Sequence, residues 1–209
     1  MEFRKVFEER WFNVPNLLSV TRVFMIPFFA VLGRDHARNP GSGGALLGLV
    51  LIVAGVMLTD MLDGFLARHL NQETMMGRYL DPIADKLTSV TALVVLSAYY
   101  NFPLWVLVFF FIREILGVWG GTYLYFKRDM QGRPNIWGKV GVFWIAGLTL
   151  WYILHPWLGT RLPAGHILLT SPIYGAYGLV LILALGIVSY WRSYAGVVFG
   201  WGPKSNKTP

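Results

Sequence analysis

Residues 60–85 read DMLDGFLARHLNQETMMGRYLDPIAD, and this stretch decides how the rest of the chain is interpreted. It contains two pairs of aspartates: Asp60 and Asp63 are three residues apart, and Asp81 and Asp85 are four apart. On a helix, either spacing puts both side chains on one face, about one turn apart. Long apolar runs flank the stretch on both sides. The pattern therefore predicts four carboxylates at the ends of two membrane helices that a short polar loop joins.

The residue types of this stretch indicate a divalent-metal site. Four carboxylates that lie close together repel each other unless cations share the site. Carboxylate oxygens are hard ligands that suit Mg²⁺, Mn²⁺ or Ca²⁺. The chain has no cysteine, and His69 falls outside the carboxylate spacing. Two cations bridged by carboxylates can clamp the attacking and the leaving oxygen of a phosphoryl transfer, so the stretch predicts that kind of chemistry.

The same stretch resembles the signature of the CDP-alcohol phosphatidyltransferases. It matches all eight motif positions, which are Asp60, Asp63, Gly64, Ala67, Arg68, Gly77, Asp81 and Asp85. The resemblance implies that Asp60, Asp63 and Asp81 hold metal ions, with two Mg²⁺ or Mn²⁺ ions expected, and that Asp85 also touches them. By the family's assignment of its last aspartate, Asp85 is expected to act as the general base.

The resemblance also implies a site for a CDP-linked lipid. Residues 15–22, PNLLSVTR, are similar to the family's opening N-P-N-x-L-T-x-x-R, although Ser19 stands where threonine is more usual. Arg68 offers a planar fork that pairs with diphosphate oxygens, and glycines allow close approach. The residues expected to bind the CDP-lipid are Asn16, Thr21, Arg22, Gly64, Ala67, Arg68 and Gly77.

A second set of charges is expected to bind the phosphate of the acceptor alcohol. Arg113 and Glu114 fall near the middle of an apolar run, where a charge costs about 3 kcal/mol on insertion scales and should face a polar cavity. An Arg-Glu here and Gly138-Lys139 further on are similar to the family branch that uses glycerol 3-phosphate. Gly121 and Val142 depart from that branch, which often has Arg and Thr at these positions. The expected acceptor-binding residues are Arg113, Lys139 and Arg133.

Composition predicts an all-α integral membrane protein with a single domain over residues 1–200. Of the 209 residues, 55% are hydrophobic and only 14% are charged, which is typical of membrane chains. Residues 1–12 alternate apolar and charged side chains at helical spacing, as an amphipathic helix on the membrane surface does. Residues 201–209 are predicted to be a disordered tail. Six transmembrane helices are expected, at residues 16–32, 45–67, 75–100, 104–126, 136–154 and 173–191.

The distribution of Lys and Arg predicts the orientation of the chain. Three of the 18 basic residues fall within spans, and three fall on one side, at Arg34, Arg38 and Arg161. The other twelve fall on the side that holds both termini and the carboxylate stretch. Because cytoplasmic loops are enriched in Lys and Arg, both termini and the active site are expected in the cytoplasm, in a multi-pass protein of the cell (inner) membrane. The basic residues are spread over loops, so nucleic-acid binding is not expected.

The expected reaction transfers a phosphatidyl group from CDP-diacylglycerol to glycerol 3-phosphate, and the resemblance implies a homodimer. Two alternatives stay open at this point. One is a cardiolipin synthase, or another member of the family with a different acceptor. The other is a cation-coupled transporter, which would place its carboxylates near mid-membrane and show weak symmetry between halves. The motif occurs once and lies toward one face, which argues against a transporter.

Overall fold

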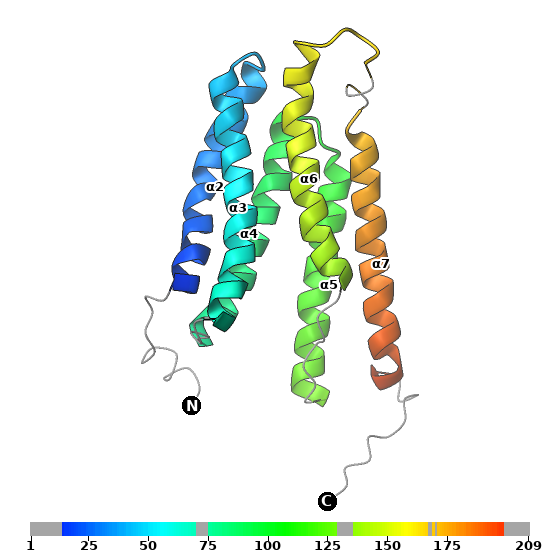
Figure 1. The fold of residues 1–209 in the computed structure, drawn as a ribbon. Helices are drawn as coiled ribbons and strands as arrows, with labels where there is room; N and C mark the ends of the chain where they lie inside the picture. Colours follow the sequence, from blue (N-terminus) through cyan, green and yellow to red (C-terminus); the bar gives the residue numbers. More distant parts are fainter. Residues whose placement is uncertain (1–13, 70–74, 129–135, 167–168, 170, 199–209) are drawn as a thin grey trace, which may run out of the picture. The chain divides into compact units, whose positions relative to one another are not determined.

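The computed structural model describes residues 14–69, 75–128, 136–166, 169 and 171–198 (Figure 1). Within these ranges, the side chains at 14–15, 63–69, 75–76, 78–79, 121–128 and 193–198 are outside the description. The described part of the chain forms six long α-helices: α2 (Val14–Arg38), α3 (Gly43–His69), α4 (Met75–Tyr99), α5 (Leu104–Arg128), α6 (Ile136–Gly159) and α7 (Ile173–Val198).

These helices confirm the prediction of an all-α membrane protein. Within the described residues, four helical segments are long and apolar enough to cross a membrane: Asn16–Arg38, Gly43–Leu62, Ile136–Gly159 and Ile173–Arg192. They belong to α2, α3, α6 and α7. The helix α4 carries Asp81, Asp85 and Lys86 in its first half, which lowers its apolar character. The predicted surface helix at 1–12 and tail at 201–209 lie outside the described residues.

The first helix is longer than the sequence predicts. A loop was expected over residues 33–44, because this segment is rich in Gly, Pro and charge, yet α2 continues to Arg38. Tertiary contacts hold this extra length in place: the hydroxyl of Tyr100 donates to the carbonyl oxygen of Gly33 at 3.0 Å. His36 is fully buried, and its Nε2 lies 3.0 Å from the carbonyl oxygen of Ile153. The connection to α3 is therefore short, and covers residues 39–42.

The fifth predicted span also ends too early, because α6 passes residue 154 and continues through Pro156 to Gly159. Contacts beyond this point again support the extension, since Nε2 of His155 lies 3.1 Å from the carbonyl oxygen of Leu169. The predicted spans at 75–100 and 104–126 leave only a short connection between them, and the structure has a short connection between α4 and α5. Asn101 has a φ of 56°, a left-handed conformation that asparagine tolerates better than most residues.

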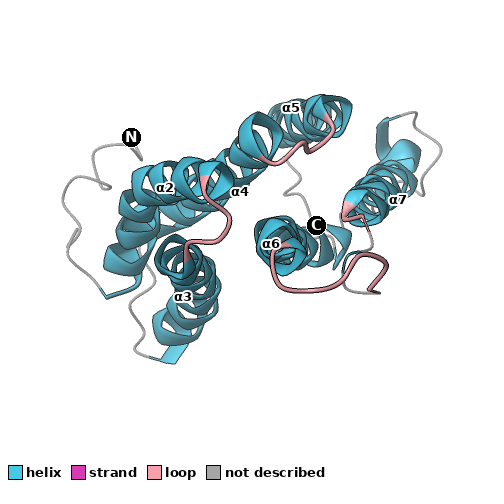
Figure 2. Ribbon diagram, turned by 90° about the horizontal axis from the view of Figure 1, so that it is seen from above, coloured by secondary structure: helices cyan, strands magenta, loops and turns pink. Residues whose placement is uncertain are grey.

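The helices form two compact units. Unit 1 comprises residues up to Pro103 together with Ile145–Ile173, and so contains α2, α3, α4 and the later part of α6. In this unit α2 packs against both α3 and α4, as Figures 1 and 2 show. Its buried apolar side chains come from all four elements: Phe29, Leu49, Val53, Leu93, Leu96 and Ile153.

Unit 2 comprises Leu104–Trp144 and the chain from Tyr174 onward, and so contains α5, the start of α6 and α7. Trp144 lies close against α7, where its Nε1 donates to the carbonyl oxygen of Gly175 at 2.9 Å. A Cβ atom at Gly178 would lie 2.6 Å from Cζ2 of the same indole, so only glycine fits there. The rings of Trp105 and Tyr177 join α5 to α7, with 6.0 Å between their centroids.

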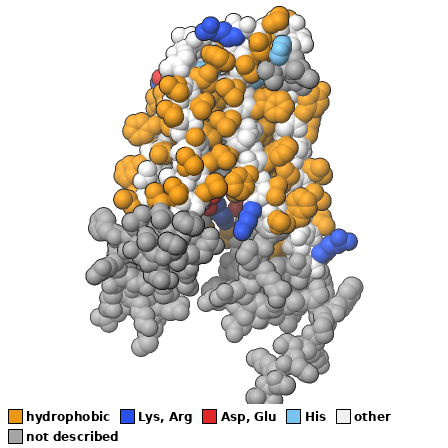
Figure 3. Space-filling model, viewed as in Figure 1, with side chains coloured by type: hydrophobic (Ala, Val, Ile, Leu, Met, Phe, Trp, Pro, Cys, Tyr) orange, Lys and Arg blue, Asp and Glu red, His pale blue; other side chains and the backbone are white. Residues whose placement is uncertain are grey.

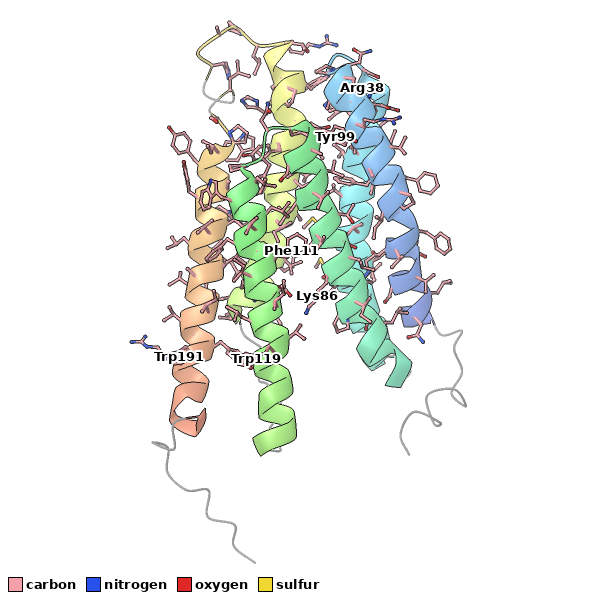
Figure 4. The ribbon with its side chains drawn as sticks, turned by 180° about the vertical axis from the view of Figure 1, so that it is seen from behind. Arg38, Lys86, Tyr99, Phe111, Trp119 and Trp191 are labelled. Atoms are coloured by element: carbon pink, nitrogen blue, oxygen red, sulfur yellow. The ribbon has the colours of Figure 1, made fainter. Side chains whose placement is uncertain are left out.

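Apolar side chains dominate the exposed faces of the helices (Figure 3). Phe24 and Phe28 on α2 are 68% and 64% exposed, a placement that suits lipid contact better than water. Figure 4 shows Arg38 at the C-terminal end of α2 and Lys86 near the middle of α4. In unit 2, Trp119 lies in the second half of α5 and Trp191 in the second half of α7.

At Gly33, α2 approaches α4 closely, and we expect Gly33→Ala to destabilise the protein. A Cβ there would lie 2.7 Å from Cγ1 of Val95, a buried and stiff β-branched side chain. Overpacking of this kind costs about 1–3 kcal/mol of unfolding free energy. Equilibrium unfolding in detergent measures it. Gly44→Ala is the matched control, because its Cβ would meet nothing within 4 Å.

A second substitution separates the clash from other effects of alanine at residue 33. Val95→Ala removes the atom that the new Cβ would meet. The double variant Gly33→Ala, Val95→Ala should therefore lose less stability than the two single variants together. Strict additivity of the two losses would contradict the close approach that the structure shows.

Candidate active site

Three of the four predicted metal-binding aspartates have described side chains, and all three contact polar side chains of α2. Asp60 lies in the second half of α3, and Asp81 and Asp85 lie in the first half of α4. The α2 residues that they meet lie in its first three turns. The cluster is therefore at the end of unit 1 where α2 begins, α3 ends and α4 begins.

Arg22 is at the centre of this cluster. Its Nη1 donates to Oδ1 of Asp60 at 3.0 Å and also to Oδ1 of Asp85, so carboxylates from two helices meet at one nitrogen. The Arg22 side chain is 1% exposed, whereas Asp60 and Asp85 are 36% and 35% exposed. The guanidinium thus lies behind the two carboxylates, and each carboxylate keeps an accessible side.

Ser19 extends the network to the third aspartate. Its hydroxyl donates to Oδ1 of Asp81 and accepts a hydrogen bond from Nη2 of Arg22 at 3.2 Å. Ser19 is fully buried. One hydroxyl thus uses both its donor and its acceptor capacity to connect Asp81 to the guanidinium. Through these contacts, α2 fixes the positions of side chains from both α3 and α4.

The electrostatics of the cluster favour a further cation. The network joins three carboxylates to one guanidinium: Asp60 and Asp85 contact Arg22 directly, and Asp81 is connected to it through Ser19, so these residues together keep a net negative charge. In an apolar environment, such a charge is costly unless it is paired. Lys86 is exposed and follows Asp85 directly on α4 (Figure 4). The accessible carboxylate oxygens are hard donors of the kind that bind Mg²⁺ and Mn²⁺.

The donor set fits the predicted metals in kind. Among the described side chains, no three His, Cys, Asp or Glu residues gather closely enough to hold a metal ion by themselves. Asp63, the remaining predicted ligand, lies three residues after Asp60 on α3, and its side chain is outside the description. Two carboxylates that meet at one point, with further aspartates on the same helices, are a donor set that hard divalent cations accept.

The structure also places several of the residues predicted to bind the CDP-lipid. Asn16 is 4% exposed in the first turn of α2, and Gly77 is buried in the first turn of α4. The hydroxyl of Thr21 donates to the carbonyl oxygen of Leu17 at 2.8 Å, within its own helix. Arg22 belongs to the carboxylate cluster, as described above. The predicted residues whose side chains lie outside the description are Gly64, Ala67 and Arg68.

The predicted acceptor-binding residues belong to unit 2. Arg113 and Glu114 form an ion pair on α5, with side chains 25% and 17% exposed. A Cβ at Gly138 would lie 3.7 Å from Nη2 of Arg113, so the start of α6 runs beside this guanidinium. Lys139 follows directly and is exposed. Arg133 lies outside the described residues.

Sequence reasoning did not assign a site role to Ser19, and it did not pair Arg22 with the aspartates. A signal was present: Asn16, Ser19 and Arg22 recur every three residues in a run that is apolar elsewhere except at Thr21. That spacing puts polar groups on one face of a helix. Side chains on such a face need polar partners within the protein, and the aspartates of α3 and α4 are those partners.

Fold and site together define a multi-pass helical membrane protein with a charged cluster among its helices. The chain belongs to the CDP-alcohol phosphatidyltransferase family, because the model of that family matches residues 12–200. It is therefore an enzyme of this class. Membership of the family decides against the alternative of a cation-coupled transporter.

Three relatives carry the same name, CDP-diacylglycerol–glycerol-3-phosphate 3-phosphatidyltransferase. The Aquifex aeolicus protein is 38% identical over 138 residues, which cover 64% of this chain and 71% of that protein. The Bacillus subtilis protein is 30% identical over 141 residues, covering 62% and 73%. The Escherichia coli K12 protein is 40% identical over 90 residues, covering 43% and 47%.

Proposed function

We propose that this enzyme transfers the phosphatidyl group of CDP-diacylglycerol to sn-glycerol 3-phosphate, giving phosphatidylglycerol phosphate and CMP. The observation that carries the proposal is the meeting of Asp60, Asp81 and Asp85 around Arg22 and Ser19, in a chain that belongs to the family. The names of the three relatives support the choice of acceptor.

In this proposal the aspartates of α3 and α4 bind two divalent cations, Mg²⁺ or Mn²⁺. Asp60, Asp63 and Asp81 are the ligands, and Asp85 touches the ions as well. When bound, the ions supply positive charge that neutralises the diphosphate and polarises the phosphorus under attack. The accessible sides of Asp60 and Asp85 support this role.

The chain's own residues bind the CDP-lipid and move the proton. Arg68 binds the diphosphate, and Gly64, Ala67 and Gly77 allow it to approach the helices closely, with Asn16 and Thr21 on α2 completing the site. Asp85 accepts the proton of the acceptor hydroxyl as its oxygen bonds to the phosphatidyl phosphorus. The bond from that phosphorus to CMP breaks, and CMP leaves with the electron pair.

Arg113, Lys139 and Arg133 bind the phosphate of glycerol 3-phosphate. The planar fork of Arg113 pairs with two phosphate oxygens, and a phosphate that carries two charges can compete with Glu114 for it. Lys139 adds a second positive charge next to Gly138. The ion pair of Arg113 with Glu114, and the closeness of Gly138 to that guanidinium, support this assignment.

The membrane arrangement that we propose has six spans in one domain, with both termini and the carboxylates facing the cytoplasm. The six long helices and the excess of basic residues on one side support it. The diacyl chains stay in the bilayer while the nucleotide and glycerol 3-phosphate reach the site from the cytoplasm. A homodimer is part of the proposal on the strength of the family resemblance alone.

A headgroup screen tests the proposed reaction. Purified protein receives labelled CDP-diacylglycerol and Mg²⁺ or Mn²⁺, with glycerol 3-phosphate, phosphatidylglycerol, inositol phosphate or serine in separate reactions. We expect CMP release with glycerol 3-phosphate only, and its loss on addition of a chelator. Release with phosphatidylglycerol alone would make the protein a cardiolipin synthase. Release that a chelator leaves unchanged would contradict the metal-dependent mechanism.

A further inference from the structure

The face of α2 that is turned toward the protein interior carries a stripe of three buried polar residues. Asn16, Ser19 and Arg22 are 4%, 0% and 1% exposed, whereas Leu17 and Phe24 on the same helix are 59% and 68% exposed. The helix therefore directs apolar side chains outward and polar ones toward α3 and α4. In a membrane, polar side chains on such a face must find their partners inside the protein.

The contacts of this stripe are with the aspartates that the proposed function assigns to metal binding. Nη1 of Arg22 contacts Oδ1 of both Asp60 and Asp85, and the hydroxyl of Ser19 contacts Oδ1 of Asp81. A bond from Arg22 to Ser19 links the two contacts. One helix thereby fixes the position of carboxylates from two other helices.

The burial of Arg22 indicates that its guanidinium can stay in place when a metal ion binds to the carboxylates. Its side chain is 1% exposed, while the two carboxylates are about one-third exposed. A cation that arrives from the accessible side meets the carboxylates first and the guanidinium behind them. A carboxylate has about four lone-pair directions, so one contact with Nη1 leaves others for a metal ion.

We propose that Ser19 and Arg22 are positioning residues, which orient Asp60, Asp81 and Asp85 so that they can bind divalent cations together. This inference rests on the proposed metal-dependent function. Arg22 also offsets part of the repulsion between Asp60 and Asp85, because both carboxylates contact its Nη1. The role differs from direct contact with the CDP-lipid, which would leave metal affinity unchanged when Arg22 is altered.

The test measures Mn²⁺ binding to the detergent-purified protein from the electron paramagnetic resonance signal of free Mn²⁺, without substrates. Arg22→Lys keeps the positive charge but has a single nitrogen, so it cannot contact the carboxylates as Nη1 does and the Ser19 hydroxyl as Nη2 does at the same time. Mutation of a residue that hydrogen-bonds a metal ligand typically weakens metal binding 10–100-fold. We therefore expect the Kd of this variant for Mn²⁺ to rise at least about tenfold. Arg34→Lys is the matched control, since Arg34 is on the same helix and pairs with the exposed Asp35.

A second pair of variants keeps the test decisive if Arg22→Lys folds poorly. Ser19→Ala removes the hydroxyl that orients Asp81 and changes no charge. It should raise the Kd for Mn²⁺, whereas Ser19→Thr, which keeps the hydroxyl, should not. The melting temperature of each variant is measured alongside, so that a change in Mn²⁺ affinity can be separated from a loss of folded protein.

The outcomes separate failure of this inference from failure of the proposed function. If the wild-type protein binds Mn²⁺ and both Arg22→Lys and Ser19→Ala bind it equally well, the positioning role is wrong while the metal site stands. Tighter binding by Arg22→Lys would mean that the guanidinium competes with the metal ion, and would also overturn the inference. If the wild-type protein binds no Mn²⁺, the metal-dependent function fails, and the positioning role fails with it.

Discussion

Asp85→Asn should lower kcat for CMP release about 10³-fold, because general-base catalysis contributes some 10²–10⁴-fold. Asparagine keeps the shape of the side chain and can still accept a hydrogen bond from Arg22, but it cannot take a proton from the acceptor hydroxyl. Binding of CDP-diacylglycerol should survive, and isothermal titration calorimetry in detergent measures it. Near-normal turnover by this variant would show that Asp85 is not the base.

Two comparisons make this result specific to the proposed base. Asp35→Asn is the matched control, because Asp35 is an exposed carboxylate that also pairs with an arginine, Arg34. Asp60→Asn tests the other role of the cluster, that of holding the metal. Loss of a ligand weakens metal binding, so a higher Mn²⁺ concentration should partly restore Asp60→Asn. It should restore Asp85→Asn far less, since the missing proton acceptor has no substitute.

Arg113→Ala should raise the KM for glycerol 3-phosphate about 10- to 100-fold. A charge-assisted hydrogen bond contributes some 1.5–3 kcal/mol to binding. Each 1.4 kcal/mol of lost binding free energy weakens affinity about tenfold. The KM for CDP-diacylglycerol should stay unchanged. Steady-state kinetics with each substrate varied in turn measures both constants. Arg161→Ala is the control, since the Arg161 guanidinium lies over the ring of Trp157, 5.7 Å from its centroid.

The ion pair of Arg113 with Glu114 requires a further variant. Alanine at residue 113 removes this partner of Glu114 in an apolar helix, and we expect a loss of stability from that change alone. The double variant Arg113→Ala, Glu114→Gln also removes the negative charge of residue 114. It should recover stability while the KM for glycerol 3-phosphate stays high. A KM that returned to normal together with stability would make the ion pair structural and would remove Arg113 from the acceptor site.

Helix starts were predictable because their signals are local. The sequence predicts that spans begin at residues 75, 104, 136 and 173, and α4, α5, α6 and α7 begin at these residues. Helix ends were less predictable. The extension of α2 to Arg38 depends on Tyr100 and Ile153, which are far away in the sequence. A charged, glycine-containing segment is typical of a loop until such contacts are known.

The sequence by itself determined the reaction class, because motif spacing and helical periodicity are local properties that a chain carries before it folds. It placed Asp60 and Asp63, and Asp81 and Asp85, at helical spacing between apolar runs. Only the tertiary structure decided what Arg22 contacts: its partners are 38 and 63 residues away, on α3 and α4. A buried guanidinium must pair within the protein, but which carboxylates it reaches depends on how three helices pack.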